Sequence, residues 1–241
     1  MRPGAYLTAK QSANTEVNMF TNHSRQIVGA LGALVLLALT APAQATVVWD
    51  LNPNGQNAPV GGSSHTYTSS GFSITAYGFD NHSGIGTAHD LFYKNQAPIG
   101  GAVEMGLGLV NTSNNELQAN MNFIQFDFTA ALAAGMFHGQ ISVGSIQPGE
   151  TFVIFGSNTL GTLGTQVSTL YGSSVDNQWV NIQNFGQFNY YSVMAITDDV
   201  LPIAVRADVA PVPEMNTLLP IGAVLALLIA TNALRKRRGR A

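Results

Sequence analysis

The chain has 241 residues, of which ten are basic, thirteen are acidic and none is cysteine. The charged fraction of 10% is low beside the roughly 25% of ordinary soluble domains, and the 25 glycines favour a turn-rich β protein. The length allows one ordinary domain with targeting segments. The absence of cysteine excludes disulfides, thiolate metal sites and a cysteine nucleophile.

Charge is distributed unevenly along the chain. Between Thr46 and Pro211 there are only two basic residues, Lys94 and Arg206, against eleven acidic ones. A segment of that sign repels phosphate backbones, so we expect no nucleic-acid partner. The other eight basic residues lie outside this segment, before the first apolar run of the chain or after the last one.

The N-terminal segment has the three-part layout of a secretory signal peptide. Arg25 precedes a thirteen-residue run without charge, and Ala43 and Ala45 then supply a small-x-small cleavage signal. The run is too short to span a bilayer comfortably. We therefore expect passage through the Sec machinery and removal of residues 1–45 by signal peptidase. The stretch before Met19 has no pattern, so Met19 is the candidate true start.

The other end of the chain is predicted to be a membrane-spanning tail. Residues 217–234 are uncharged and would span about 27 Å as a helix, close to the roughly 30 Å hydrocarbon core. Residues 235–241 are basic, which places the tail in the cytoplasm and the preceding domain outside. The membrane stop signal consists of Arg235, Lys236, Arg237 and Arg238.

The order of features at this end resembles the PEP-CTERM sorting signal of Gram-negative bacteria. Val212, Pro213 and Glu214 match the family motif, and an apolar helix and a basic end follow. Met215 stands where the family usually has a second proline. The resemblance implies that an exosortase at the inner membrane processes the tail near the linker of residues 209–216. It also implies delivery to the cell surface or the exopolysaccharide.

One alternative to this interpretation of the tail stays open. The tail could be a plain membrane anchor that is never processed. Similar tails are also sometimes labelled after ice-binding proteins, although the middle of this chain has no repeated Thr-x-Thr ladder that would support ice binding.

Residues 46–208 are expected to form the extracytoplasmic domain, and their periodicity is that of short strands. The strand-like segments are 72–76, 124–128, 151–155, 179–182, 190–196 and 203–205. Turn-forming Gly, Asn, Ser and Pro residues separate them, and only residues 130–137 indicate a helix. Many short strands without alternating long helices favour an all-β fold, an antiparallel, jelly-roll-like β-sandwich.

Residues 104–117 and the apolar run that follows are similar to a pattern in PEP-CTERM ectodomains, where a Gly-Leu-Gly strand precedes an Asn-Glu pair. The resemblance implies that Asn115 and Glu116 lie in a loop near a cation, Ca²⁺ above all, because carboxylate and amide oxygens are its preferred ligands. The simpler interpretation is a polar turn over residues 111–115, with Glu116 as a solvated or turn-capping acid. We favour the simpler interpretation and predict no cofactor.

Other candidate sites are weaker. His82 and His89, seven residues apart and flanked by Asp80 and Asp90, indicate either a Zn²⁺ site or a glycine-rich surface loop, and we favour the loop. The pair Asp198–Asp199 indicates a cation site or, preferably, an edge-strand turn. There is no Gly-x-Ser-x-Gly motif, and eleven acids offer too many carboxylate pairs to select a glycosidase pair. We assign no catalytic residue.

The aromatic side chains of the middle segment are the remaining candidates for ligand binding. We expect most of them to pack in the core, although some could form a sugar-stacking platform. They are Trp49, Tyr67, Tyr77, Tyr93, Tyr171, Trp179, Tyr190 and Tyr191. The leading hypothesis is therefore a non-enzymatic exported protein with a structural, adhesive or glycan-binding domain. The alternative is a secreted polysaccharide-active enzyme on a jelly-roll scaffold.

Overall fold

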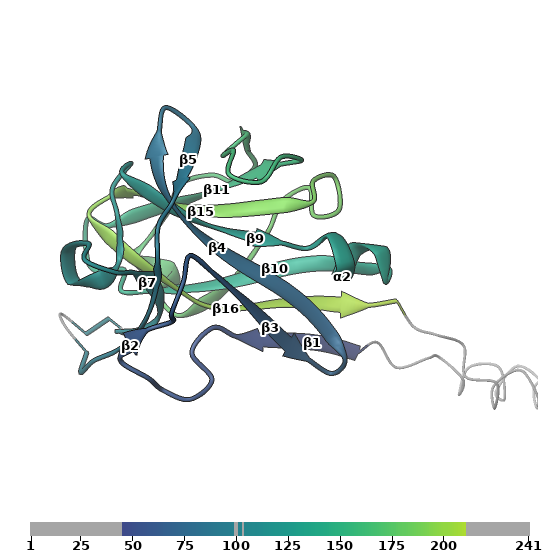
Figure 1. The fold of residues 1–241 in the computed structure, drawn as a ribbon, viewed down its shortest axis with the longest axis horizontal. Coiled ribbons are helices and arrows are strands. Elements are labelled where there is room, and N and C mark those ends of the chain that lie inside the picture. Colours follow the sequence, from purple (N-terminus) through teal and green to yellow (C-terminus); the bar gives the residue numbers. More distant parts are fainter. Residues whose placement is uncertain (1–44, 99–100, 103, 211–241) are drawn as a thin grey trace, which may run out of the picture. The chain divides into compact units, whose positions relative to one another are not determined.

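Antiparallel strands dominate the part of the chain that the computed structural model describes, which comprises residues 45–98, 101–102 and 104–210 (Figure 1). Except for Ala45, the predicted signal peptide lies outside these residues, as do the sorting motif, the membrane helix and the basic tail. No helix within the described ranges has the length and apolar character needed to cross a membrane.

The first sheet brings the two ends of the described chain together. Its strand order is β1 (Ala45–Asp50), β16 (Asp199–Val209), β10 (Met136–Gly144) and β14 (Gln178–Asn181), with β8 (Leu117–Gln118) paired to β16. Ala45 pairs with Val209 and Asp50 pairs with Ala204, so the first described strand pairs with the last along its whole length.

The second sheet is the larger one. Its order is β12 (Thr165–Gln166), β11 (Thr151–Ser157), β15 (Tyr190–Thr197), β9 (Asn122–Asp127), β4 (Phe72–His82) and β3 (Ser64–Ser69). Two short strands extend it: β13 (Tyr171–Gly172) pairs with β11, and β5 (Ile85–Ala88) pairs with β4.

A third, smaller sheet and three short helices complete the described elements. The sheet has the order β2 (Ala58–Pro59), β6 (Leu91–Asn95) and β7 (Met105–Leu109). The helices are α2 (Thr129–Ala133) and the 3₁₀ turns η1 (Ser113–Asn115) and η2 (Ser173–Val175).

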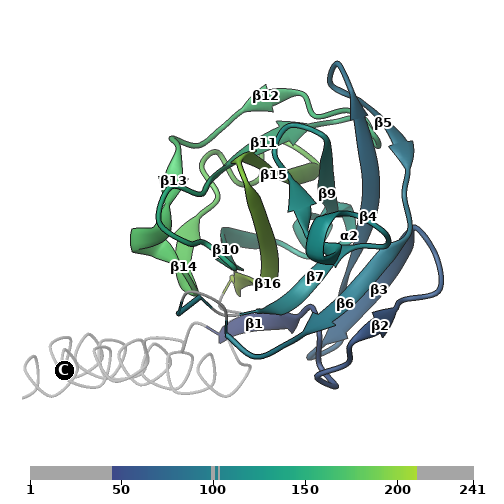
Figure 2. The ribbon, with the colours of Figure 1, turned by 90° about the vertical axis from the view of Figure 1, so that its left-hand side faces the viewer.

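Figure 2 shows the strands of the three sheets arranged around a common interior. One hydrophobic core receives side chains from all three sheets. Alternation along the strands supplies it: in β4, for example, Ile74 and Ala76 are buried while the residues between and beside them are half-buried. Trp49 from β1 is almost fully buried, and its indole N–H donates a hydrogen bond to the Phe72 carbonyl at 3.0 Å. The core therefore ties the first sheet to the second.

The strand predictions are confirmed, and one helix prediction was partly wrong. Each segment predicted to be extended contains or overlaps a strand of the structure. The helix expected over residues 130–137 ends at Ala133, and Met136 already begins β10. Gly135 ends the helix because its φ of 82° lies in the left-handed region, and the next residue, Met136, is buried in the core.

Candidate functional site

The first candidate is an open groove of about 570 Å³, which we call the amide groove. Its lining residues are 137–140, 181–185 and Asp208. They come from the beginning of β10, the end of β14 with the loop after it, and the end of β16.

A bulge in β10 shapes this groove. The pairing of β10 with β16 shifts register between Phe137 and Gln140. At the bulge Gly139 is buried against the ring of Phe185, which leaves no space for a Cβ atom. The Gly139 carbonyl also accepts a hydrogen bond from the Ile182 amide at 2.9 Å. The bulge therefore holds the loop after β14 at the edge of the groove.

Hydrogen bonds fix the polar groups that line the groove. The side-chain oxygen of Gln140 accepts from Arg206 Nε at 2.6 Å, and the Gln140 amide donates to Asn181 Oδ1 at 2.6 Å. Arg206 is held in turn over the ring of Trp179, with its guanidinium carbon 4.4 Å from the ring centroid. The amides of Gln140 and Asn181 therefore have defined orientations.

Aromatic and charged groups complete the groove. The rings of Phe137 and Phe185 are half-buried, so each exposes part of its surface. Asp208 accepts a hydrogen bond from the Thr46 hydroxyl at 2.7 Å, and its other oxygen lies 3.6 Å from Nδ1 of the exposed His138. Ring surfaces beside a few fixed donors and acceptors suit a neutral polyhydroxylated ligand.

The second candidate is a smaller cavity of about 220 Å³, which we call the acidic pocket. Every lining residue is polar: Glu104, Asn114, Glu116, Ser145, Gln147, Glu150, Asp198 and Asp199. The three glutamates of the described residues all lie here, although they are far apart in the sequence. Four connections build the pocket: the β6–β7 connection with Glu104, the segment around η1, the β10–β11 loop and the β15–β16 turn.

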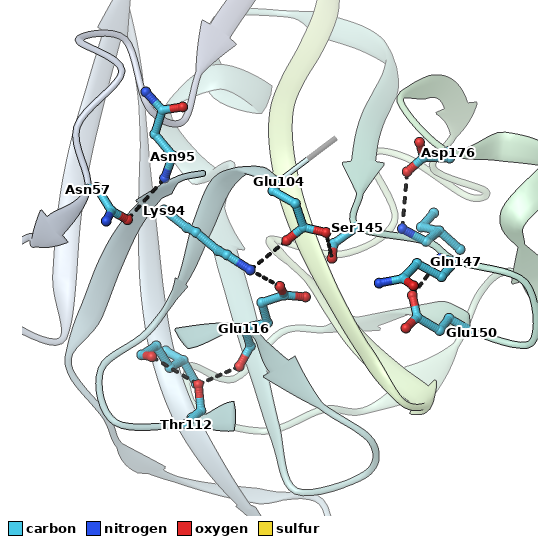
Figure 3. A network of polar contacts seen from close by, with 12 residues as sticks. Asn57, Lys94, Asn95, Glu104, Thr112, Glu116, Ser145, Gln147, Glu150 and Asp176 are labelled. Atoms are coloured by element: carbon cyan, nitrogen blue, oxygen red, sulfur yellow. Dashed lines mark hydrogen bonds and ion pairs between the residues drawn. The ribbon is translucent and has the colours of Figure 1, made fainter. Parts of the chain in front are cut away.

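A buried lysine closes one side of the acidic pocket (Figure 3). Lys94 Nζ donates a hydrogen bond to Glu104 Oε2 at 2.5 Å and another to Glu116 Oε1. Ser145 donates to the other oxygen of Glu104 at 2.9 Å. Burial lowers the pKa of Lys94, but the two carboxylates outweigh it and leave that pKa raised, so the amine stays charged.

Glu116 is the unusual member of this cluster. Its Oε2 is the only buried side-chain polar atom in the described part of the chain that has no hydrogen-bond partner. Figure 3 shows this oxygen pointing away from Lys94, toward the side where Gln147 and Glu150 lie. Burial raises the pKa of Glu116 to about 7, although the hydrogen bond from Lys94 opposes the shift.

The acids at the rim of the pocket also destabilise each other's charged forms. The pKa of Glu150 is raised by burial and then by the negative charges of Asp198 and Asp199. The pKa of Asp199 is raised by burial and by Asp198. Glu150 is anchored because its Oε2 accepts a hydrogen bond from the Gln147 amide at 2.5 Å. The pocket thus gathers more negative charge than its single lysine neutralises.

The structure separates the two residues of the predicted Asn-Glu pair. The Asn115 side chain accepts a hydrogen bond from the Asn111 amide at 3.1 Å, inside its own turn, and does not line the acidic pocket. The favoured interpretation of Glu116 as a solvated acid was wrong, because its side chain is 2% exposed and ion-paired.

The histidine cluster is part of a hairpin formed by β4 and β5. His89 Nδ1 lies 2.7 Å from Asp80 Oδ1, and its Nε2 lies 2.6 Å from the Val110 carbonyl, so both ring nitrogens are occupied. His82 is exposed at the end of β4. Within the described ranges, no three His, Asp or Glu side chains lie close enough together to form a ready-made metal site.

Four of the eight aromatic candidates pack in the hydrophobic core and are not available to bind a ligand. Trp49, Tyr67, Tyr93 and Tyr191 are buried in the core, whereas Trp179 is half-buried beneath Arg206. The predicted turn is confirmed at Asp198, between the end of β15 at Thr197 and the start of β16 at Asp199. The edge-strand part of that prediction was wrong, because β15 and β16 each pair with a strand on both sides.

Sequence reasoning missed Lys94 and the residues of the amide groove. Lys94 is the only lysine among the described residues, and that isolation was the available signal for an ion-paired lysine.

Comparison of the chain with family models, with curated proteins and with solved structures found no significant match.

Proposed function

We propose that this chain is an exported, PEP-CTERM-like surface protein whose β-sandwich domain binds glycans without turning them over. Signal peptidase, the Sec machinery and an exosortase act on its two ends, which carry the cations that the domain lacks. The precursor is anchored in the inner membrane, and the domain then reaches the cell surface or the exopolysaccharide.

The strand connections support a jelly-roll sandwich with an insertion. In a jelly roll, the first strand pairs with the last one, and the second strand pairs with the next-to-last one. Here β1 pairs with β16, and β9 pairs with β15. On its other side, β16 pairs with β10. In the second sheet, β15 likewise pairs on its other side with β11. In this description the elements from β2 to β8 form an insertion between the first two strands.

The amide groove is the observation that carries glycan binding. Hydroxyl-rich ligands need donors and acceptors in fixed positions, and Gln140 and Asn181 provide them. Sugar rings also need an apolar surface, which Phe137 and Phe185 provide. With Asp208 as its only carboxylate, the groove suits a neutral or weakly polar sugar better than an acidic one.

The groove favours binding over hydrolysis. A glycosidase needs two carboxyl groups about 5 to 10 Å apart, and the groove lining contains one. The acidic pocket has several carboxylates, but its lining contains no aromatic ring to hold a sugar. We therefore place the polysaccharide-active enzyme second.

The direct test is to measure binding of the purified full-length chain to a panel of immobilised polysaccharides. Asn181→Ala and Gln183→Ala should each weaken binding by about fivefold, the effect of losing one hydrogen bond of ~1 kcal/mol. Gln178→Ala is the matched control, because Gln178 is exposed on β14, the strand that contains Asn181, but does not line the groove. Equal losses in all three variants, or no binding to any polysaccharide, would contradict the proposal. Detection of shortened polysaccharide chains after incubation would favour the alternative of a polysaccharide-active enzyme.

A further inference from the structure

The acidic pocket contains an imbalance of charge that the described residues do not resolve. Five carboxyl groups line it, and its one ammonium group, that of Lys94, is shared by Glu104 and Glu116. Arg206, the other basic side chain of the described residues, is bonded to Gln140 and lies over Trp179. No further lysine or arginine among the described residues neutralises Glu150, Asp198 or Asp199.

The position of one carboxylate oxygen shows where a neutralising positive charge is missing. Glu116 Oε2 is buried and has no hydrogen-bond donor, and a buried acceptor without a partner is destabilising because its lost hydration is not replaced. Because this oxygen points away from Lys94, a second cation can approach it from the side of Gln147 and Glu150 (Figure 3).

We propose that the acidic pocket binds one divalent cation, Ca²⁺ by preference, with Glu116 Oε2 as its innermost ligand. Glu150, Asp198 and Asp199 supply the remaining carboxylate ligands, and the side-chain carbonyl oxygens of Asn114 and Gln147 are neutral ones. Lys94 keeps the other oxygen of Glu116 and holds Glu104 in place.

The ligand chemistry favours calcium over zinc and magnesium. The lining offers only oxygen atoms as ligands, without histidine or cysteine, whereas zinc sites in proteins rely on nitrogen and sulfur. Magnesium demands a nearly ideal octahedron with short bonds, while calcium accepts six to eight oxygens in flexible geometry. Ligands from three separate connections suit the more tolerant ion.

Among the described residues the carboxylates of the acidic pocket do not converge closely enough to form a ready-made metal site, so calcium binding has to draw them together. Like charges repel, so acids that share a pocket with one lysine spread until a cation draws them together. Asp198 is exposed on a turn and Asn114 on η1, so neither side chain is held in place by burial. Binding would then link the η1 segment, the β10–β11 loop and the β15–β16 turn.

The test is calorimetric titration of the chelator-treated full-length chain with CaCl₂ and MgCl₂ at neutral pH, with thermal unfolding as a second readout. We expect one calcium per chain, a dissociation constant on the order of 10⁻⁴ to 10⁻³ M as in extracellular modules, and weaker magnesium binding. Calcium should raise the melting temperature. No heat and no thermal shift at about 10 mM calcium, roughly ten times that constant, would overturn the proposal.

Two variants make the test specific to this pocket. Glu116→Gln should weaken calcium binding at least tenfold and raise the melting temperature of the calcium-free protein. Asp198→Asn should weaken binding several-fold. Asparagine tolerates the φ of 57° at this position, so the variant tests the charge and keeps the fold.

Asp90→Asn is the matched control, because Asp90 is exposed and does not line the acidic pocket. It should bind calcium like the natural chain. If Glu116→Gln does not fold, the calcium affinities of Asp198→Asn and Asp90→Asn are compared to decide whether the acidic pocket binds the ion. Equal calcium affinity in these two would overturn the proposal, whatever the polysaccharide experiment shows.

Discussion

Lys94 holds the most consequential single position in the domain. Its side chain is fully buried and bonds to two carboxylates that are themselves buried. A lysine that merely paired with one acid would form a neutral couple. Here the lysine neutralises part of a larger negative group, so its loss leaves two uncompensated acids.

Lys94→Met is therefore expected to destabilise the domain by about 3–5 kcal/mol, the usual cost of removing one partner from a buried ion pair. Urea unfolding followed by fluorescence of Trp49 and Trp179 measures this change. The triple variant Lys94→Met, Glu104→Gln, Glu116→Gln should recover most of the lost stability. A Lys94→Met protein as stable as the natural chain would contradict the ion-paired cluster.

Stability should also fall as the pH rises through the weakly acidic range. Glu116 has a pKa of about 7 in the folded protein against 4.5 as the ordinary value, so the folded state binds more protons between these limits. The loss from pH 4.5 to above 7 is about 3 kcal/mol for this group. The raised pKa values of Glu150 and Asp199 act in the same direction.

Thermal unfolding without calcium between pH 5 and pH 8 tests this dependence, with Glu116→Gln as the comparison. His89 also has a raised pKa and loses its stabilising effect as the pH rises above 6.5, so some slope remains in the variant. The variant should nonetheless show a clearly flatter profile. Identical slopes in both proteins would show that Glu116 titrates normally.

Among the elements, β7 depends most on close backbone approach. A Cβ atom on Gly108 would collide with the Asn115 carbonyl oxygen, and one on Gly106 would meet the Pro202 carbonyl oxygen at 2.5 Å. These glycines let β7 lie against η1 and β16 beside the acidic pocket. The Gly-Leu-Gly pattern therefore has a packing reason in this chain.

Gly108→Ala should destabilise the domain by about 1–3 kcal/mol, the range for overpacking a well-filled core. Gly62→Ala is the matched control, since a Cβ atom there would meet nothing within 4 Å. Chemical denaturation of both variants measures the difference. Equal stability of the two would mean that β7 shifts freely, against the packing described here.

The alternation of apolar and polar residues predicted β4 and β9, and a compact apolar run predicted β11. The apolar run has its reason in burial, because β11 is buried along most of its length. Pattern reading failed for β10, where the bulge at Gly139 interrupts the alternation next to a short helix. The sequence offered Glu116 and the pair Asp198–Asp199 only as separate cation candidates, and it pointed to no residue of the amide groove. The acidic pocket joins Glu104 to Asp199 through tertiary folding, and no local pattern reports such distances.

At the scale of the whole molecule, the account rests on how charge is divided between the domain and its ends. The domain has eleven acids and two bases, whereas the eight remaining bases of the chain lie outside it. The pairing of β1 with β16 brings both ends of the domain together, beside the amide groove. The proposed glycan binding and the proposed calcium site of millimolar affinity are both suited to the outside of the cell.

The location of the domain is the central claim, and the absence of cysteine allows a direct measurement of it. A single cysteine is introduced at the exposed Ser173 in one variant and at Ala241 in another, and spheroplasts are treated with a membrane-impermeant maleimide. We predict that Ser173→Cys is labelled while the inner membrane is intact and that Ala241→Cys in the uncleaved precursor is labelled only after lysis. Labelling of Ser173→Cys only after lysis would contradict the account.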